Sequence, residues 1–137
     1  PWIELRASIP VGISMGLPWQ LVFITAVATN AVLGPLVYFG LDKLLPFARK
    51  IDFVDYIYNR IIKKTQRKAF PYVEKYGLLG IALFVAIPLP GSGSWSGALA
   101  AYLLGLSHRK FAIANLLGVL IAGAIVTALS LGVIRFL

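Results

Sequence analysis

The sequence predicts an all-α integral membrane protein. Its 137 residues are 59% hydrophobic and have a mean hydropathy of +0.85, which is too apolar for a soluble domain of this size. Two uncharged stretches are long enough to cross a membrane, and prolines and glycines break two other apolar stretches. We expect one membrane domain over residues 1–137, built from two transmembrane helices, two oppositely oriented re-entrant hairpins forming an inverted repeat, and a cytoplasmic amphipathic helix.

Residues 1–18 are predicted to form part of the first re-entrant hairpin. The apolar part, residues 7–17, is too short to cross a bilayer, and Pro10 and Gly12 are expected to interrupt it. The sequence opens on Pro1 rather than on a methionine, and no cleavable signal pattern is visible. This suggests that a further segment, such as a helix, precedes it.

Residues 19–41 and 111–134 are the predicted transmembrane helices. They contain 23 and 24 uncharged residues, whereas about 20 are enough to cross a hydrocarbon core of about 30 Å. Asn30 and Asn115 are the notable polar residues in these helices. A hydrogen bond between helices is the favoured role for both, and contact with a substrate is the alternative.

Residues 42–76 form a basic segment. The net charge is +8, and nine of the thirteen Lys and Arg residues lie between Asp42 and Lys75. Apolar residues recur every three or four positions from Phe47 to Ile61, which predicts an amphipathic helix. A basic loop between apolar spans is typical of the cytoplasmic side, so we expect the helix to bind anionic lipid headgroups. A helix that binds a partner protein is the alternative, and nucleic acid is not expected.

Residues 77–107 are predicted to form the second re-entrant hairpin. As one helix they would be about 46 Å long, more than a bilayer core requires. Pro88 and Pro90 each remove an amide donor, and Gly91 and Gly93 loosen the backbone, so the helix should break into two legs of half the membrane depth. Basic residues flank the segment on both sides, which indicates that it enters and leaves at the cytoplasmic face.

The second leg carries small residues at every fourth position, a pattern that lets another helix of the chain or a second copy pack closely. They are Gly93, Gly97, Ala101 and Gly105. A faint echo at an offset of 89 residues relates positions 15–18 to 104–107 and Gly34 to Gly123. With the basic loop inside, Trp19 lies outside and the two broken segments open to opposite faces, which is the inverted repeat of many transporters.

Two motifs resemble those of a known family. Residues 4–10 read E-L-R-A-S-I-P, and residues 88–97 read P-L-P-G-S-G-S-W-S-G, with Ser92 in place of the more usual threonine. Both are similar to motifs of the prokaryotic small multidrug export proteins, a family similar to the DedA superfamily. The resemblance implies the cytoplasmic membrane of a prokaryote, opposed re-entrant hairpins, and transport of lipid phosphates or coupling to protons.

The two hairpin tips are the expected substrate and ion site. Ionisable residues at membrane depth usually face a cavity, and Glu4 would carry a proton. The start of the second leg presents free amides and a positive dipole end, which together with Arg6 favour an anion; capping by the serines is the alternative. The candidate residues are Glu4, Arg6, Pro10, Pro88, Pro90, Gly91, Ser92, Gly93, Ser94, Ser96, Asn30 and Asn115.

These residues predict a transporter of an amphipathic anion such as a lipid phosphate, coupled to protons through Glu4. An exporter of cationic drugs, with Glu4 as counter-ion, and a non-transporting structural membrane protein are the alternatives. An enzyme is not expected, because the serines do not fit G-x-S-x-G and the single His108 lies in a basic, interfacial stretch. One His and no Cys predict neither metal nor cofactor. The expected partners are membrane lipids and a second copy in a homo-oligomer, a dimer, which would cover the tips.

Overall fold

The computed structural model describes residues 4–88 and 92–137. Within these ranges it describes the side chains at every position except 62 and 65–75. Within these ranges the chain is all-helical, as predicted, and contains no strand. The helices, in chain order, are α1 (Glu4–Ser14), α2 (Trp19–Ala48), α3 (Asp52–Tyr76), α4 (Leu78–Ala86), α5 (Ser94–Leu103) and α6 (His108–Phe136). The predicted sites Pro90 and Gly91 lie outside the described residues.

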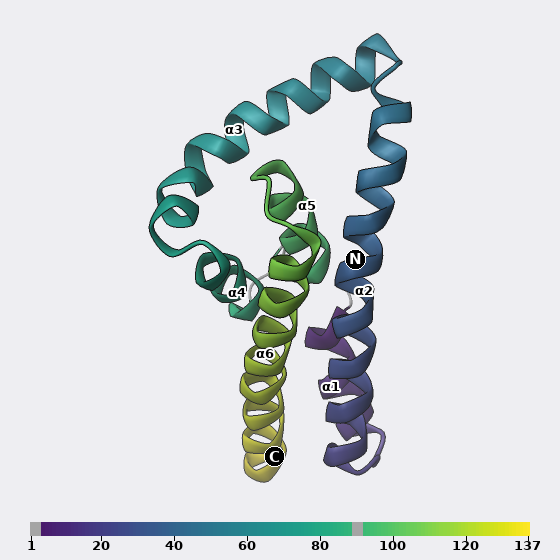
Figure 1. The fold of residues 1–137 in the computed structure, drawn as a ribbon. Helices are drawn as coiled ribbons and strands as arrows, with labels where there is room; N and C mark the ends of the chain where they lie inside the picture. The colour runs from purple at the N-terminus through teal and green to yellow at the C-terminus, as the bar shows by residue number, and fades with distance from the viewer. Residues whose placement is uncertain (1–3, 89–91) are drawn as a thin grey trace.

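The long helices α2 and α6 are apolar and long enough to cross a membrane, and they contain the two predicted spans. They pack side by side and run in opposite directions (Figure 1). Their outer faces expose large apolar side chains, such as Ile24 and Leu36 in α2 and Leu129 in α6. A soluble monomer rarely exposes so much contiguous apolar surface, so these faces are suited to lipid.

The chain contains two copies of a unit made of a short helix, a turn and a long helix. Helix α2 begins at Trp19 and α6 at His108, the same offset of 89 residues as in the sequence echo. Both turns use a glycine with positive φ, Gly16 at 83° and Gly105 at 73°. The hydrogen bonds also correspond, because the amide of Leu17 donates to the carbonyl of residue 12 and that of Leu106 to residue 101, at 3.2 and 3.0 Å. These are matching Schellman turns.

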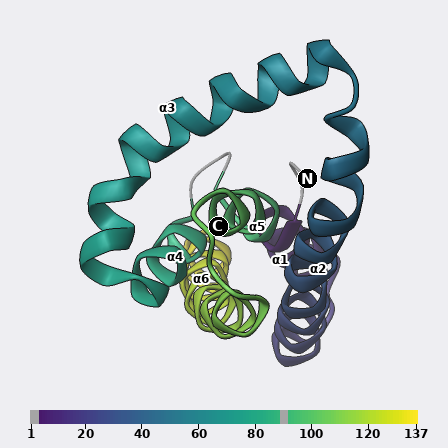
Figure 2. The same ribbon diagram turned by 45° about the horizontal axis from the view of Figure 1, so that its top comes forward.

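The two units run in opposite directions. Helix α1 descends from the middle of the molecule to the end where α2 begins, whereas α5 rises toward the other end, where α6 begins (Figures 1 and 2). The expected interruption of the first segment is wrong, since α1 continues through Pro10. One proline removes a single amide donor, and packing against α2 and α6 holds the helix together. Gly12 serves this packing, because a Cβ there would lie 2.8 Å from Val22 Cγ1.

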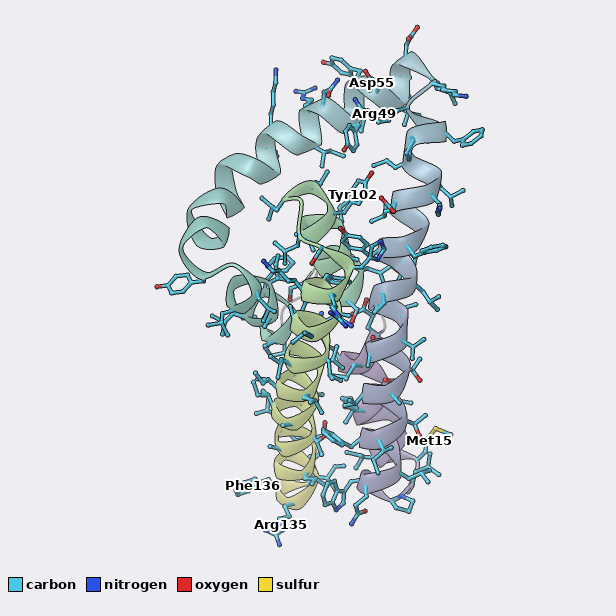
Figure 3. The ribbon with its side chains drawn as sticks, in the orientation of Figure 1. Met15, Arg49, Asp55, Tyr102, Arg135 and Phe136 are labelled. Atoms are coloured by element: carbon cyan, nitrogen blue, oxygen red, sulfur yellow. The ribbon has the colours of Figure 1, made fainter. Side chains whose placement is uncertain are left out.

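Helix α3 forms within the basic segment and leaves the body of the molecule. Arg49 Nε donates to Asp55 Oδ1 at 2.8 Å where α2 turns into α3, and this bond raises the pKa of the guanidinium. Figure 3 shows Arg49 and Asp55 at one end of the molecule and Met15 and Arg135 at the opposite end. The apolar side chain of Phe53 is exposed. Contact of α3 with lipid headgroups stays a prediction.

Helices α4 and α5 flank the expected break. They contain 9 and 10 residues, or about 14 and 15 Å each, half of a hydrocarbon core. Within the small-residue stripe of α5, Gly97 faces the chain's own α4, because a Cβ on it would collide with Val85, whereas Gly93 faces Glu4 of α1. Gly105 lies outside the stripe's packing, in the turn after α5. A second copy would therefore need another surface, and the dimer stays a prediction.

Replacing Gly118 by alanine should destabilise the protein, because α4 and α6 pack there without room for a side chain. A Cβ on Gly118 would lie 2.6 Å from Val85 Cβ and 2.7 Å from the main-chain oxygen of Ala82. Overpacking of this kind costs about 1 to 3 kcal/mol. Gly132→Ala is the matched control on the same helix, since nothing lies within 4 Å of its Cβ. Melting in detergent compares the two variants; equal melting temperatures would contradict this packing.

Candidate functional site

The first turn of α1 binds the broken end of α4 through Arg6. Arg6 Nη2 donates to the carbonyl of Ile87 at 2.7 Å, to Ser92 Oγ at 3.0 Å and, at 3.4 Å, to the carbonyl of Val85. Its Nη1 donates to the carbonyl of Ser92. Carbonyls at the end of a helix lack amide partners within that helix. The guanidinium thus supplies donors where the chain has stopped being helical.

Glu4 accepts hydrogen bonds from the start of α5, on the other side of the break. Its carboxylate accepts from the amide of Ser94 at 3.3 Å and from the amide of Trp95 at 3.4 Å. A carboxylate is favourable there, because the first amides of a helix are unpaired and its dipole is positive. The N-cap residue, Gly93, has φ 148°, and a Cβ on it would collide with Glu4 Oε2. Glycine is required at this position on both counts.

The alternative prediction that the serines cap α5 is wrong, since its N-cap has no side-chain hydrogen bond. Ser92 Oγ donates to the carbonyl of Ile87 at 2.6 Å, Ser94 Oγ to that of Asn30 at 3.3 Å, and Ser96 Oγ to that of Gly93 at 3.4 Å. Each hydroxyl satisfies a main-chain acceptor. The cap comes from Glu4, 90 residues earlier than Ser94.

The predicted hydrogen bond between the spanning helices is present. Asn115 Nδ2 donates to the carbonyl of Asn30 at 3.0 Å, and Asn30 Nδ2 donates to the carbonyl of Ala26 at 2.9 Å. Gly34 makes room, because a Cβ there would collide with the amide of Asn115. Asn30 and Asn115 are buried, and the Oδ1 atom of each has no partner among the described residues. Ser94 of α5 also donates to the main-chain carbonyl of Asn30, so Asn30 of α2 joins α5 and α6.

A small cavity lies between the charged pair and the spanning helices. Its volume is about 10 Å³, which is about the space of one water. It is lined by Glu4, Arg6, Asn30, Ser94, Gly93 and apolar residues including Val119 of α6. Asn30 and Val119 each lie near the middle of a long helix. The site therefore sits about halfway along both candidate spans.

Two larger grooves open on either side of α1. The groove between α1 and α2 has a volume of about 430 Å³ and includes Glu4, Ser8 and Asn30 in its lining. The groove between α1 and α6 has a volume of about 510 Å³ and includes Arg6 with the predicted residues Pro10 and Pro88. The carboxylate and the guanidinium thus border different grooves, although they are two residues apart.

The structure brings together most of the predicted residues that it describes. Glu4, Arg6, Ser92, Gly93, Ser94 and Asn30 meet at the break, Pro10 and Pro88 line the Arg6 groove, and Asn115 joins through Asn30. Ser96 has no hydrogen bond to Glu4 or Arg6 in the described part of the chain. Sequence reasoning missed the carbonyls of Val85 and Ile87, because a main-chain acceptor has no residue-type signature.

His108 lies apart from this site. Its Nε2 atom is 3.5 Å from Asp42 Oδ2, its ring lies against Tyr38, and its side chain is half exposed. Among the described residues no group of three or more His, Cys, Asp or Glu could hold a metal ion.

Comparison with known proteins bears on the family and not on the substrate. No curated protein and no solved structure matches the chain. One family model does, and it covers residues 4–125, which include both charged residues of α1, the break and most of α6. Together with two helices long enough to span a membrane, this indicates a small membrane export protein. The chain belongs to the family described as "putative small multi-drug export protein".

Proposed function

We propose that the protein is a transporter of DedA-like type that moves an amphipathic anion, such as a lipid phosphate, across the cytoplasmic membrane of a prokaryote. The observation that carries the proposal is the carboxylate of Glu4 on the amides of Ser94 and Trp95, with Arg6 beside it. A substrate anion has the same chemistry as this carboxylate. It could replace Glu4 on the same two amides.

The groove between α1 and α6 suits the rest of such a substrate. Arg6 lies at the groove, and Leu129, Val133 and Ile134 of α6 provide an apolar lining. At about 510 Å³ it falls in the range of ligand pockets, about 300 to 1,000 Å³. The headgroup would lie near the guanidinium and the break, and the apolar part would lie along α6 next to lipid.

Glu4 would couple this movement to protons. Protonation removes the negative charge that favours the α5 amides, because a neutral carboxyl forms a weaker bond there. The other charged side chain at the cavity is Arg6, and the parts of α2, α5 and α6 that line the cavity contribute uncharged residues. A proton on Glu4 and an anion on the amides would leave the local charge unchanged.

The proposal includes the membrane arrangement. Helices α4 and α5 would form a hairpin that enters from the cytoplasmic face, and α1 would be one leg of the opposed hairpin. Broken backbone at membrane depth is tolerated where protein satisfies its polar groups, and Glu4 and Arg6 do so here. Helix α3 would lie on anionic headgroups with its Lys and Arg residues.

Export of cationic drugs is the second candidate, and the family description points to drugs. Glu4 also lines the groove of about 430 Å³ between α1 and α2, where it could act as a counter-ion. Hydrolysis is not proposed. The hydroxyls of Ser92, Ser94 and Ser96 donate to main-chain carbonyls, so we assign them to holding the break.

Substitution of the two charged residues should separate the candidates. In proteoliposomes, Arg6→Gln should slow movement of a fluorescent lipid phosphate by about tenfold or more, because loss of one good charged contact costs about 1.5 to 3 kcal/mol. Glu4→Gln should abolish its dependence on a pH gradient. The rates are measured with a membrane-impermeant quencher.

The same liposomes carry the control for the second candidate. A cationic dye is tested with the same variants, and each variant's melting temperature is recorded. Dye transport that survives Arg6→Gln and is lost in Glu4→Gln would replace the anion proposal by drug export. Transport of neither compound by the native protein would favour a structural role.

The hairpin can be tested by labelling, because the chain has no native cysteine. Lys75→Cys and Arg109→Cys flank the segment from α4 to α5, and both should react with an impermeant thiol reagent from the cytoplasmic side. Met15→Cys, at the opposite end of the molecule (Figure 3), should react from the other side. Labelling of positions 75 and 109 from opposite faces would refute the hairpin.

A further inference from the structure

Two buried polar atoms at the small cavity beside Glu4 have no partner among the described residues. One is Oδ1 of Asn30, a residue that is 5% exposed and whose Nδ2 atom donates to the carbonyl of Ala26. The other is Nε of Arg6, whose Nη atoms donate to the carbonyls and the hydroxyl at the break. Asn30 and Arg6 both line the cavity. An acceptor and a donor therefore border the same small space.

The cavity has the size of the partner that these two atoms need. A buried donor or acceptor without a hydrogen bond is unfavourable, and in native proteins an ordered water commonly supplies the missing bond. The volume of about 10 Å³ is about the space of one water. Much of the remaining wall is apolar, and its side chains cannot pair with either atom; they are Leu5, Val85, Val119 and Ala122.

We propose that this cavity binds one water molecule, which accepts a hydrogen bond from Arg6 Nε and donates to Asn30 Oδ1 and to the carboxylate of Glu4. A buried water typically makes about three hydrogen bonds, and these groups supply one donor and two acceptors. Glu4 also lines the cavity. Its carboxylate accepts from two amides, at 3.3 and 3.4 Å, and a carboxylate has lone pairs for further bonds.

Ions match the cavity less well. Hard metal cations such as Ca²⁺ and Mg²⁺ take six or more oxygen ligands, whereas the lining side chains that carry oxygen are those of Glu4, Asn30 and Ser94. The guanidinium of Arg6 would also repel a cation. An anion would lie against the Glu4 carboxylate and Asn30 Oδ1, which would repel it. A neutral molecule that both donates and accepts is the better match.

The water gives Asn30 a part in the proton coupling of Glu4. This part rests on the proposed function, whereas the water site itself does not. A substrate anion that takes the α5 amides leaves Glu4 without those donors. The water remains as a polar partner, because it can donate to a carboxylate and accept from a protonated carboxyl. Asn30 is then a positioning residue that acts on Glu4 through the water.

Proton-detected solid-state NMR of the full-length protein in lipid bilayers tests the site without a transport assay. Arg6 Nε is buried, so its assigned N–H signal should show a cross peak to water only when a water is bound beside it. Asn30→Leu replaces the acceptor by an apolar side chain of similar size and should abolish this cross peak. No cross peak in the native protein, or an unchanged one in Asn30→Leu, would overturn the proposal.

A second cavity variant and a matched control complete the test. Ala122→Val should also abolish the cross peak, because the added methyl groups fill the cavity that Ala122 lines, and it replaces Asn30→Leu if that variant does not fold. Thr127→Val is the control, since Thr127 Oγ1 is also buried and unpaired among the described residues but does not line the cavity. It should keep the cross peak, and a loss there would overturn the assignment to this cavity.

The transport assay separates the water from its role. In proteoliposomes, Asn30→Leu should slow the pH-driven movement of the lipid phosphate several-fold, and Thr127→Val should not. If Asn30→Leu abolishes the cross peak without slowing transport, the positioning role is overturned and the water site stands. A native protein that shows the cross peak but moves no lipid phosphate would refute the proposed function and, with it, the role of Asn30.

Discussion

The fold depends on satisfying the main-chain groups of a helix that stops halfway along the two spans. Glu4 and Arg6 lie two positions apart on α1, so they point to different sides of the helix. Arg6 reaches the carbonyls that end α4, and Glu4 reaches the amides that begin α5. Each hydrogen bond to a charged group contributes about 1.5 to 3 kcal/mol, and an unpaired group in hydrocarbon costs several. The break and the placement of α1 therefore stabilise each other.

The two units differ where the chemistry is. At the offset of 89 residues Glu4 corresponds to Gly93, Arg6 to Trp95 and Asn30 to Val119. The absence of a side chain at Gly93 leaves the space that the Glu4 carboxylate occupies. The groove beside Trp95 is the counterpart of the Arg6 groove, and Trp95 stands there among apolar residues of α2. The repeat supplies a scaffold with two similar halves. The charged residues Glu4 and Arg6 occur in the first half alone, so the two grooves differ in charge although their backbones correspond.

Much of this fold could be predicted from the sequence. The length of an uncharged stretch predicts a spanning helix, and prolines and glycines predict a break, and both can be recognised from neighbouring residues alone. The repeat was predicted from a faint echo of positions 15–18 in 104–107 and of Gly34 in Gly123, and the first of these stretches proved to be a pair of Schellman turns. The path of α1 through Pro10 was not predictable, since tertiary packing decides whether one missing amide ends a helix. The site was predicted by residue type and not by role. Serines near a helix start suggest caps, yet the cap came from Glu4, and no local pattern encodes a contact over 90 residues.

The geometry also indicates which charged residue could move during transport. The Glu4 bonds to the α5 amides are long, at 3.3 and 3.4 Å, whereas Arg6 donates to Ile87 at 2.7 Å and also to Ser92 and Val85. An anion can replace the carboxylate and keep both amides paired, while the displaced Glu4 takes up a proton in the proposed coupling. The anion cannot replace Arg6, because carbonyls need a donor. In the transport that we propose, Glu4 therefore leaves the α5 amides while Arg6 stays on the break.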